Sequence, residues 1–282
     1  MPAWRGVRMR NGWRGRDGES SGSGETYAGG MGVVKADWLG FASTLDKASV
    51  DMLYVDPPFN TGRSQYTPVK AKMAAWRRGT TAATTKYVDA WPTMVEYVAW
   101  LRERLVATMP AMKVSGNVLI HCDWRASHHI RLLMDEVLGA DRFVNHLVWA
   151  YGLGGSSPRC FARKHDDIFL YCVEPEKAFF QAPRVAATSR RLAGKTKKAT
   201  DVLDVPSINN MSRERTGYPT QKPLALLEML VGACSPAGGL VVDPCCGSGT
   251  TLVAAKKLGR VFAGSDVNPA AVAVARKRLA NT

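Results

Sequence analysis

Short apolar runs alternate with segments of helical periodicity from residue 50 to the end of the chain. Runs of four to eight apolar residues are typical of buried strands, and apolar residues three or four apart are typical of helices packed on one side. The runs predict strands at Val50–Val55, Asn117–His121, Phe143–Ala150, Asp167–Val173, Leu240–Val242 and Arg260–Ser265. The periodic segments predict helices at Ser127–Leu138, Pro223–Cys234 and Pro269–Leu279, one that ends at Leu258, and one with the stripe Val95, Val98, Leu105 and Met109 and with Pro92 in its first turn.

Strands that alternate with helices predict an α/β fold with a mostly parallel sheet and helices on both faces. Sheets of this kind bind ligands at the carboxyl ends of their strands. Two unusual motifs follow predicted strands directly, Asp56-Pro57-Pro58-Phe59 and the glycine-rich segment 243–250. We therefore expect both motifs to line one cleft.

Composition narrows the class of protein. The 282 residues are 46% hydrophobic and 22% charged, which suits a folded domain. No apolar run approaches a membrane span, and the basic, glycine-rich start lacks the apolar segment of a secretory signal. We expect a flexible Gly/Arg-rich tail at 1–31, with Met31 an alternative start, and one domain at 32–282. The six cysteines form no Cys-x-x-Cys pair, so we expect no metal site and a reduced cytoplasmic compartment.

The net charge of +14 is concentrated in two segments. Windows 61–88 and 181–200 hold six Lys and Arg residues each and no acidic residue. Unmixed positive charge favours contact with phosphates, although flexible, soluble loops are the alternative. The proposed DNA contacts in these windows are Arg63, Lys70, Lys72, Arg77, Arg78, Lys195, Lys197 and Lys198.

The glycine-rich segment 243–250 suits a nucleoside cofactor. Gly247 and Gly249 permit a tight turn between a strand and a helix, and the segment lacks the Gly-Lys-Ser/Thr ending of a P-loop. Asp243 precedes the glycines, where it would suit a positively charged ligand group. Asp266 follows the next predicted strand, where an acid accepts hydrogen bonds from ribose hydroxyls. A purely structural turn is the alternative for the glycines alone.

The motif Asp56-Pro57-Pro58-Phe59-Asn60 suits the binding of an exocyclic amine. The Asp56 carboxylate and the Pro57 carbonyl can both accept from one NH₂ group, and the two prolines stiffen the turn. Phe59 offers a flat face on which a base can stack. The alternative is a strand that ends in a proline turn with Asp56 as a cap.

Four motifs in this order resemble the S-adenosylmethionine-dependent amino-methyltransferases of DNA, the adenine-N6 and cytosine-N4 enzymes. Their order resembles the permuted β group, as in type III modification subunits. The motifs are Asp56 to Gly62, Tyr218-Pro219-Thr220-Gln221-Lys222-Pro223-Leu224, Asp243-Pro244-Cys245-Cys246-Gly247-Ser248-Gly249-Thr250 and Gly264-Ser265-Asp266-Val267-Asn268-Pro269. Lys35-Ala36-Asp37 resembles a further family segment, with Ala in place of Gly.

The resemblance implies a Rossmann-like, seven-stranded sheet in a circularly permuted chain order. It implies that Asp56, Pro57, Pro58 and Phe59 act on an adenine flipped out of DNA, whose N6 attacks the methyl group of S-adenosylmethionine. It implies cofactor contacts from Asp37, Thr220, Lys222, Asp243, Pro244, Cys245, Gly247, Gly249, Thr250 and Asp266. For Thr220 and Lys222, capping of the following helix is an equal alternative.

The partner implied is double-stranded DNA, contacted by a basic loop at 61–91 and a short target-recognition insert at 174–216 that reads as irregular. A homodimer and a restriction endonuclease partner stay open. Three other functions also remain. Cytosine-N4 methylation is the nearest, although those enzymes more often carry Ser at the position of Asp56. Methylation of RNA or of a protein amide is the second, and a DNA-binding homologue without catalysis is the third.

Overall fold

A computed structural model describes residues 32–61, 63–67, 85–152, 156, 158–187, 194–209 and 212–282, with the backbone alone at 63–67 and 85–88. The predicted tail at 1–31, including Met31, lies outside the described residues. The main sheet has eight strands in the order β1-β12-β11-β2-β5-β7-β6-β10. These strands span Gly32–Lys35 (β1), Val50–Val55 (β2), Met112–Cys122 (β5), Phe143–Ala150 (β6), His165–Cys172 (β7), Val202–Asp204 (β10), Leu240–Asp243 (β11) and Val261–Asp266 (β12).

Neighbouring strands are parallel except for β7, which is antiparallel to both β5 and β6. The expectation of a mostly parallel, Rossmann-like α/β sheet is therefore confirmed. Two hairpins stand apart from it, β3 (Arg63–Thr67) with β4 (Thr85–Asp89) and β8 (Arg184–Ala186) with β9 (Thr196–Lys198).

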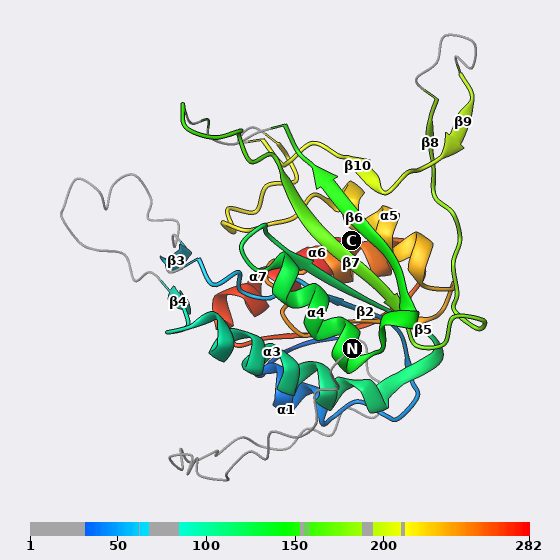
Figure 1. Ribbon diagram of the computed structural model, residues 1–282, viewed down its shortest axis with the longest axis horizontal. Coiled ribbons are helices and arrows are strands. Elements are labelled where there is room, and N and C mark those ends of the chain that lie inside the picture. The colour runs from blue at the N-terminus through cyan, green and yellow to red at the C-terminus, as the bar shows by residue number, and fades with distance from the viewer. Residues whose placement is uncertain are drawn as a thin grey trace, which may run out of the picture.

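Helices cover both faces of the sheet (Figure 1). One face carries α1 (Trp38–Ala42), α3 (Met94–Thr108) and α4 (Ser127–Val137), and the other carries α5 (Leu224–Cys234), α6 (Thr250–Lys257) and α7 (Pro269–Ala280). Short 3₁₀ turns, Met109–Ala111 and Ala140–Arg142, precede β5 and β6.

Successive residues of β2 enter different cores, as the alternation of side chains along a strand requires. Met52 and Tyr54 pack with α5–α7, whereas Leu53 and Val55 pack with α1, α3 and α4. All six residues of β2 are buried, so its sequence is a continuous apolar run with only Asp51 as an exception. The two cores hold β2 and its neighbour β11 rigidly, and these strands carry the two predicted motifs at their carboxyl ends.

Three expectations need correction. The sheet has eight strands rather than seven, because β10, inside the region expected to be irregular, pairs with β6 and buries Leu203. Val95 is 78% exposed, because α3 buries Tyr97 and Leu101 beside the predicted Leu105, while Val98 and Met109 pack partly against the same core. Pro92 lies before the helix, because Thr93 is its N-cap and accepts a hydrogen bond from the Glu96 N–H at 3.2 Å.

Asn117 ties β5 to two other segments. Its buried side-chain amide donates to the carbonyls of Phe179, at 2.8 Å, and Cys234, at 2.9 Å. Asn117→Ala should lower the free energy of unfolding by about 2–4 kcal/mol, because two buried carbonyls lose their partner. Urea unfolding measures this against Asn281→Ala at an exposed position, which should change stability by less than about 0.5 kcal/mol. Equal midpoints for the two variants would contradict the assignment.

Candidate active site

A cavity of about 490 Å³ opens at the carboxyl ends of the central strands. This volume lies in the range of small-molecule and cofactor sites. The cavity brings together both predicted motifs, because β11 and β2 are adjacent in the sheet. The predicted site residues that line it are Asp37, Asp56, Pro57, Pro58, Phe59, Thr220, Lys222, Asp243, Pro244, Cys245, Gly247, Thr250 and Asp266.

The loop after β2 is fixed through Asn60. This residue has a positive φ of 53°, which Asn tolerates better than most residues. Its N–H donates to the buried carboxylate of Asp89 at 2.7 Å, and its side-chain oxygen accepts from the Trp91 N–H at 2.8 Å. Both ends of segment 61–91 are therefore tied to the catalytic motif.

An ion pair that the sequence does not predict holds Asp56. The Lys222 ammonium donates to both carboxylate oxygens of Asp56, at 2.8 and 2.7 Å. The two side chains are only 11% and 19% exposed, so water screens the pair weakly. Lys222 Nζ also lies 4.9 Å from the centroid of the Phe59 ring. A cationic nitrogen thus lies beside the carboxylate and the aromatic ring that we expected to receive an amine.

Helix capping, the alternative role for Lys222 and Thr220, is excluded for their side chains. The first N–H of α5, from Leu224, donates to the Glu214 carboxylate at 2.7 Å, and Pro223 is the N-cap. The Lys222 carbonyl accepts from the Thr250 hydroxyl at 3.2 Å, which joins the segment before α5 to the cofactor loop.

A buried polar chain lies behind Phe59. The Tyr54 hydroxyl bonds His121 Nδ1 at 2.8 Å, and His121 Nε2 bonds Asp166 at 3.0 Å. Tyr151 donates to the other Asp166 oxygen at 3.1 Å. Burial would raise the pKa of Asp166, but its hydrogen bonds with His121 and Tyr151 and the charges of His121 and Lys222 together hold the pKa below its usual range. The buried His121 ring stacks on Phe59 with ring centroids 5.9 Å apart and so supports the site.

Two carboxylates lie at the ends of β11 and β12, Asp243 buried and Asp266 half-buried. Asp243 accepts from the Cys245 N–H at 3.1 Å, and burial raises its pKa to about 7. Asp266 accepts from the N–H groups of Gly247, at 2.9 Å, and Asn268, at 2.8 Å, and burial raises its pKa as well. The cavity therefore offers anionic groups that are costly to ionise without a cationic or hydrogen-bonding ligand.

The two glycines of the cofactor loop differ in role. Gly247 lines the cavity with φ of 51°, and an added Cβ would lie 3.2 Å from the Tyr218 ring. Gly249, predicted to contact the cofactor, does not line the cavity. Its φ is 75°, and an added Cβ would lie 2.7 Å from the Ala275 Cβ, so this glycine permits close packing of the loop against α7.

Asp37 lies at the other end of the cavity and caps α1. Its carboxylate accepts from the N–H groups of Leu39, at 3.2 Å, and Gly40, at 3.0 Å, and pairs with Arg104 at 3.3 Å. Arg104 stacks on Trp100, with its guanidinium carbon 4.3 Å from the ring centroid. Trp38, Trp91 and Trp100 also line this end. Sequence reasoning missed these aromatic residues, although the i,i+4 spacing of Trp100 and Arg104 on one helix is a usable signal.

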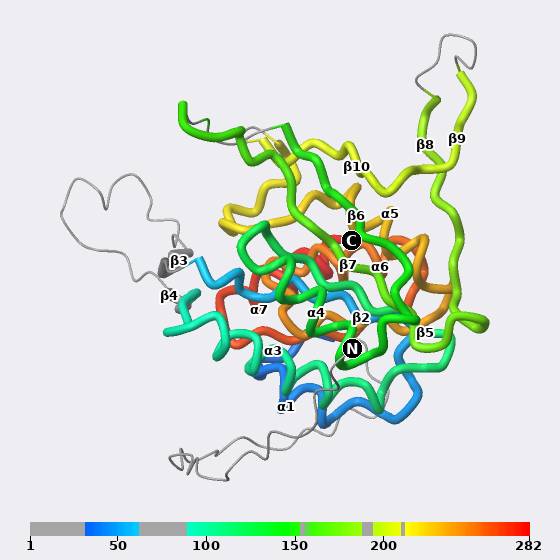
Figure 2. Tube along the Cα trace, in the orientation of Figure 1, coloured from blue at the N-terminus to red at the C-terminus, as the bar shows by residue number. Residues whose placement is uncertain are grey.

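Most of the expected DNA contacts are not placed at this cavity. Lys70, Lys72, Arg77 and Arg78 lie outside the described residues, and only the backbone of Arg63 is described. Lys195, Lys197 and Lys198 are exposed on the β8–β9 hairpin. The hairpin leaves the body on the side opposite β3 and β4 (Figure 1), and the trace in Figure 2 shows it projecting from the body.

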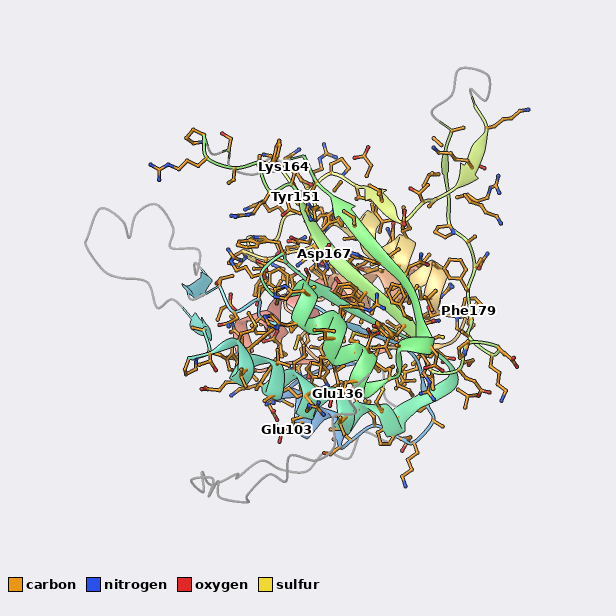
Figure 3. All side chains as sticks on the ribbon, in the orientation of Figure 1. Glu103, Glu136, Tyr151, Lys164, Asp167 and Phe179 are labelled. Atoms are coloured by element: carbon orange, nitrogen blue, oxygen red, sulfur yellow. The ribbon has the colours of Figure 1, made fainter. Side chains whose placement is uncertain are left out.

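The position of that hairpin follows from the sheet. Phe179, just upstream of β8, donates its N–H to the Ser115 carbonyl in the first half of β5 at 3.0 Å. In the connection between β6 and β7, the Tyr151 N–H donates to the Lys164 carbonyl. Figure 3 shows both residues at the end of the sheet far from Phe179. The chain that leads into the hairpin is therefore tied to the end of the sheet opposite the cavity.

Two kinds of feature are absent from the described residues. No group of three or more His, Cys, Asp or Glu side chains there could hold a metal ion. None of the helices described is both long and apolar enough to cross a bilayer.

Comparisons with known proteins identify the family of this chain. The profile of the DNA methylase family matches residues 50–277. Type II methyltransferase M.ScaI of Streptomyces caespitosus is 31% identical over 269 residues, covering 88% of this chain and 80% of the relative. DNA adenine methyltransferase YhdJ of Escherichia coli is 22% identical, covering 88% and 82%. The M1.HpyAVI–SAM complex superposes with a TM-score of 0.59 at 21% identity, covering 88% of this chain and 98% of that one. The chain belongs to the DNA methylase family, the S-adenosylmethionine-dependent amino-methyltransferases of DNA.

Proposed function

We propose that this enzyme methylates the N6 amine of adenine in DNA, with Asp56 as the residue that receives the amine. The observation that carries this proposal is the contact between Asp56 and a cationic nitrogen inside the cavity. A carboxylate at this position also distinguishes the adenine enzymes that the sequence resembles from the cytosine-N4 enzymes, which more often carry Ser. The adenine-specific name of the relative YhdJ agrees with this choice.

Asp56 acts by orientation and charge. The carboxylate and the Pro57 carbonyl accept from the two N–H bonds of the amine, which leaves the nitrogen lone pair free to attack. Positive charge develops on that nitrogen during transfer, and the fixed carboxylate stabilises it without prior deprotonation. Pro57 and Pro58 stiffen the loop, and Phe59, supported by His121, provides the stacking face for the flipped base.

The residues present fit S-adenosylmethionine. This cofactor supplies an electrophilic methyl group on a positively charged sulfur. Burial raises the pKa values of Asp243 and Asp266, so a cation or hydroxyl donors at the cavity would stabilise the ionised carboxylates. Gly247 keeps the loop open where a side chain would meet Tyr218. We propose that Asp243 faces the methionine ammonium, that Asp266 binds the ribose and that Asp37 receives the adenine amine, with Thr220, Pro244, Cys245 and Thr250 lining the space.

The partners follow from the family. The substrate is DNA, and we propose that it is double-stranded. We also propose a cytoplasmic enzyme that accompanies a restriction endonuclease, as the type II name of M.ScaI suggests. A homodimer and the permuted origin of the motif order remain predictions from the resemblance.

The function is tested by incubating the protein with labelled S-adenosylmethionine and unmethylated genomic DNA, then analysing nucleosides by mass spectrometry. N6-methyladenine should appear. Asp56→Ala should lower its rate of formation by at least about 100-fold, because a group that stabilises developing charge is lost. Asp46→Ala, at an exposed position, should leave the rate unchanged. N4-methylcytosine in place of N6-methyladenine would overturn the base assignment, and equal rates for the two variants would overturn the role of Asp56.

The pKa of Asp243, near 7, predicts that cofactor affinity depends on pH. Only the ionised carboxyl attracts a cation, so the dissociation constant should fall about tenfold per pH unit up to about pH 7 and then level off. In the cofactor-free protein, the raised pKa stabilises the fold at low pH, and this stabilisation should disappear as pH rises from about 4 to about 7. Calorimetry and urea unfolding measure the two effects. Asp243→Asn should flatten both profiles, and an unchanged pH dependence in that variant would contradict the assignment.

The hairpin lysines are proposed to contact DNA phosphates. Replacing Lys195, Lys197 and Lys198 by Gln should weaken DNA binding and reduce the slope of log affinity against log salt by about one per lysine. Fluorescence anisotropy across a salt series measures this. A charge-matched control replaces the exposed lysines Lys47, Lys177 and Lys277. If both triple variants show the same slope, the hairpin is not a specific phosphate contact.

A further inference from the structure

The Lys222–Asp56 pair keeps unused hydrogen-bonding capacity toward the cavity. An ammonium has three N–H donors and a carboxylate has about four acceptor positions. Two donors of Lys222 go to Asp56, and among the described residues Nζ donates to no other group. The pair therefore presents one free donor and at least one free acceptor, with the Nζ and carboxylate oxygens 2.7–2.8 Å apart.

This arrangement is complementary to one edge of a nucleobase. In adenine, the N6 amine donates while the neighbouring ring nitrogen N1 accepts. The edge of a flipped base is available to the protein because its Watson–Crick partner is gone. An acceptor next to a donor on the protein can therefore engage both atoms together.

We propose that Lys222 reads the target base, donating from Nζ to adenine N1 while Asp56 accepts from the N6 amine. This inference rests on the proposed function. It makes Lys222 a specificity-determining residue of the reaction rather than a cofactor contact. Two attachment points on one edge also fix the rotation of the base over Phe59, whose ring centroid lies 4.9 Å from Nζ.

The surroundings of Lys222 support a fixed donor. Its backbone carbonyl is held by Thr250 at 3.2 Å, and the preceding Gln221 side chain donates to the Glu214 carbonyl at 2.8 Å. The charge of Lys222 also reaches Asp166, which belongs to the buried chain behind Phe59. An N–H donor at Nζ is the group that a ring nitrogen acceptor requires.

The experiment uses a duplex with the site identified by sequencing the methylated genomic DNA. The target position carries adenine, 1-deazaadenine, which lacks the N1 acceptor, or 7-deazaadenine, which keeps it. In the unmodified enzyme, 1-deazaadenine should lower kcat/KM by about 10- to 100-fold, as expected for a lost bond to a charged donor. The 7-deaza duplex should stay within about threefold of adenine. Anisotropy with S-adenosylhomocysteine present should show the same order of DNA affinities.

Variants of Lys222 distinguish loss of the Lys222–N1 contact from a change in the reactivity of the N6 amine in 1-deazaadenine. Lys222→Met should methylate adenine about 10- to 100-fold less efficiently and should lose little more with 1-deazaadenine, because the contact is already absent. Lys222→Arg keeps a donor and should recover part of the discrimination. Lys113→Met breaks a similar Lys–Asp pair at the other end of β2, where Nζ is 2.7 Å from Asp51, and should discriminate as the unmodified enzyme does.

Three outcomes would overturn the inference. In the first, the unmodified enzyme has the same kcat/KM on both analogues. In the second, only 7-deazaadenine lowers kcat/KM. In the third, Lys222→Met discriminates between the analogues as strongly as the unmodified enzyme. The analogue comparison needs no variant, so a Lys222→Met protein that fails to fold leaves the test intact. Absence of methylation on the adenine duplex would instead count against the proposed function.

Discussion

The parallel pairing of β11 with β2 is the constraint on which the site depends. Val241 and Val242 lie opposite Met52 and Leu53, so the loops that follow the two strands open at the same edge of the sheet. Both strands are covered on both faces by separate hydrophobic cores, which fixes their ends in space. Asp56 and Asp243, which come from distant parts of the sequence, therefore lie close enough that the charge of Asp56 contributes to the raised pKa of Asp243.

Several carboxylates lie close together at one edge of the sheet, and their mutual repulsion favours cationic ligands there. Burial raises the pKa values of Asp243 and of the half-buried Asp266, and the charge of Asp56 is balanced by Lys222. Buried charge without a partner is unfavourable, so this edge favours ligands that bring positive charge. A sulfonium cofactor and an amine that becomes cationic during transfer both meet that requirement. The negative charge that is unfavourable without a ligand thus stabilises the positive charge of the proposed reaction.

Sequence alone predicted the features that depend on local order. The apolar runs predicted strands that end at Val55 and Val242, and β11 extends one residue further; these ends place Asp56 and Asp243 at one edge once the sheet is parallel. Features that depend on distant contacts were not predicted. The Lys222–Asp56 pair joins two loops that only the folded sheet brings together. Gly249 permits close packing against α7 and does not line the cavity. Strand β10 forms because Leu203 is buried there and Trp149 Nε1 donates to the nearby Val205 carbonyl at 2.7 Å. Val95 has the spacing of a buried helical stripe, but the elements packed against α3 determine which of its faces is buried, and Val95 lies outside that face.

One cavity is proposed to hold both the cofactor and the target amine, with Asp56 of the catalytic loop facing the amine. A crystal structure of the protein with sinefungin and a duplex that contains its recognition site tests this most directly. The account predicts sinefungin against Asp243 and Asp266, and an extrahelical adenine on Phe59 with its N6 bonded to Asp56. Sinefungin outside this cavity, or a target amine that contacts neither Asp56 nor the Pro57 carbonyl, would contradict it.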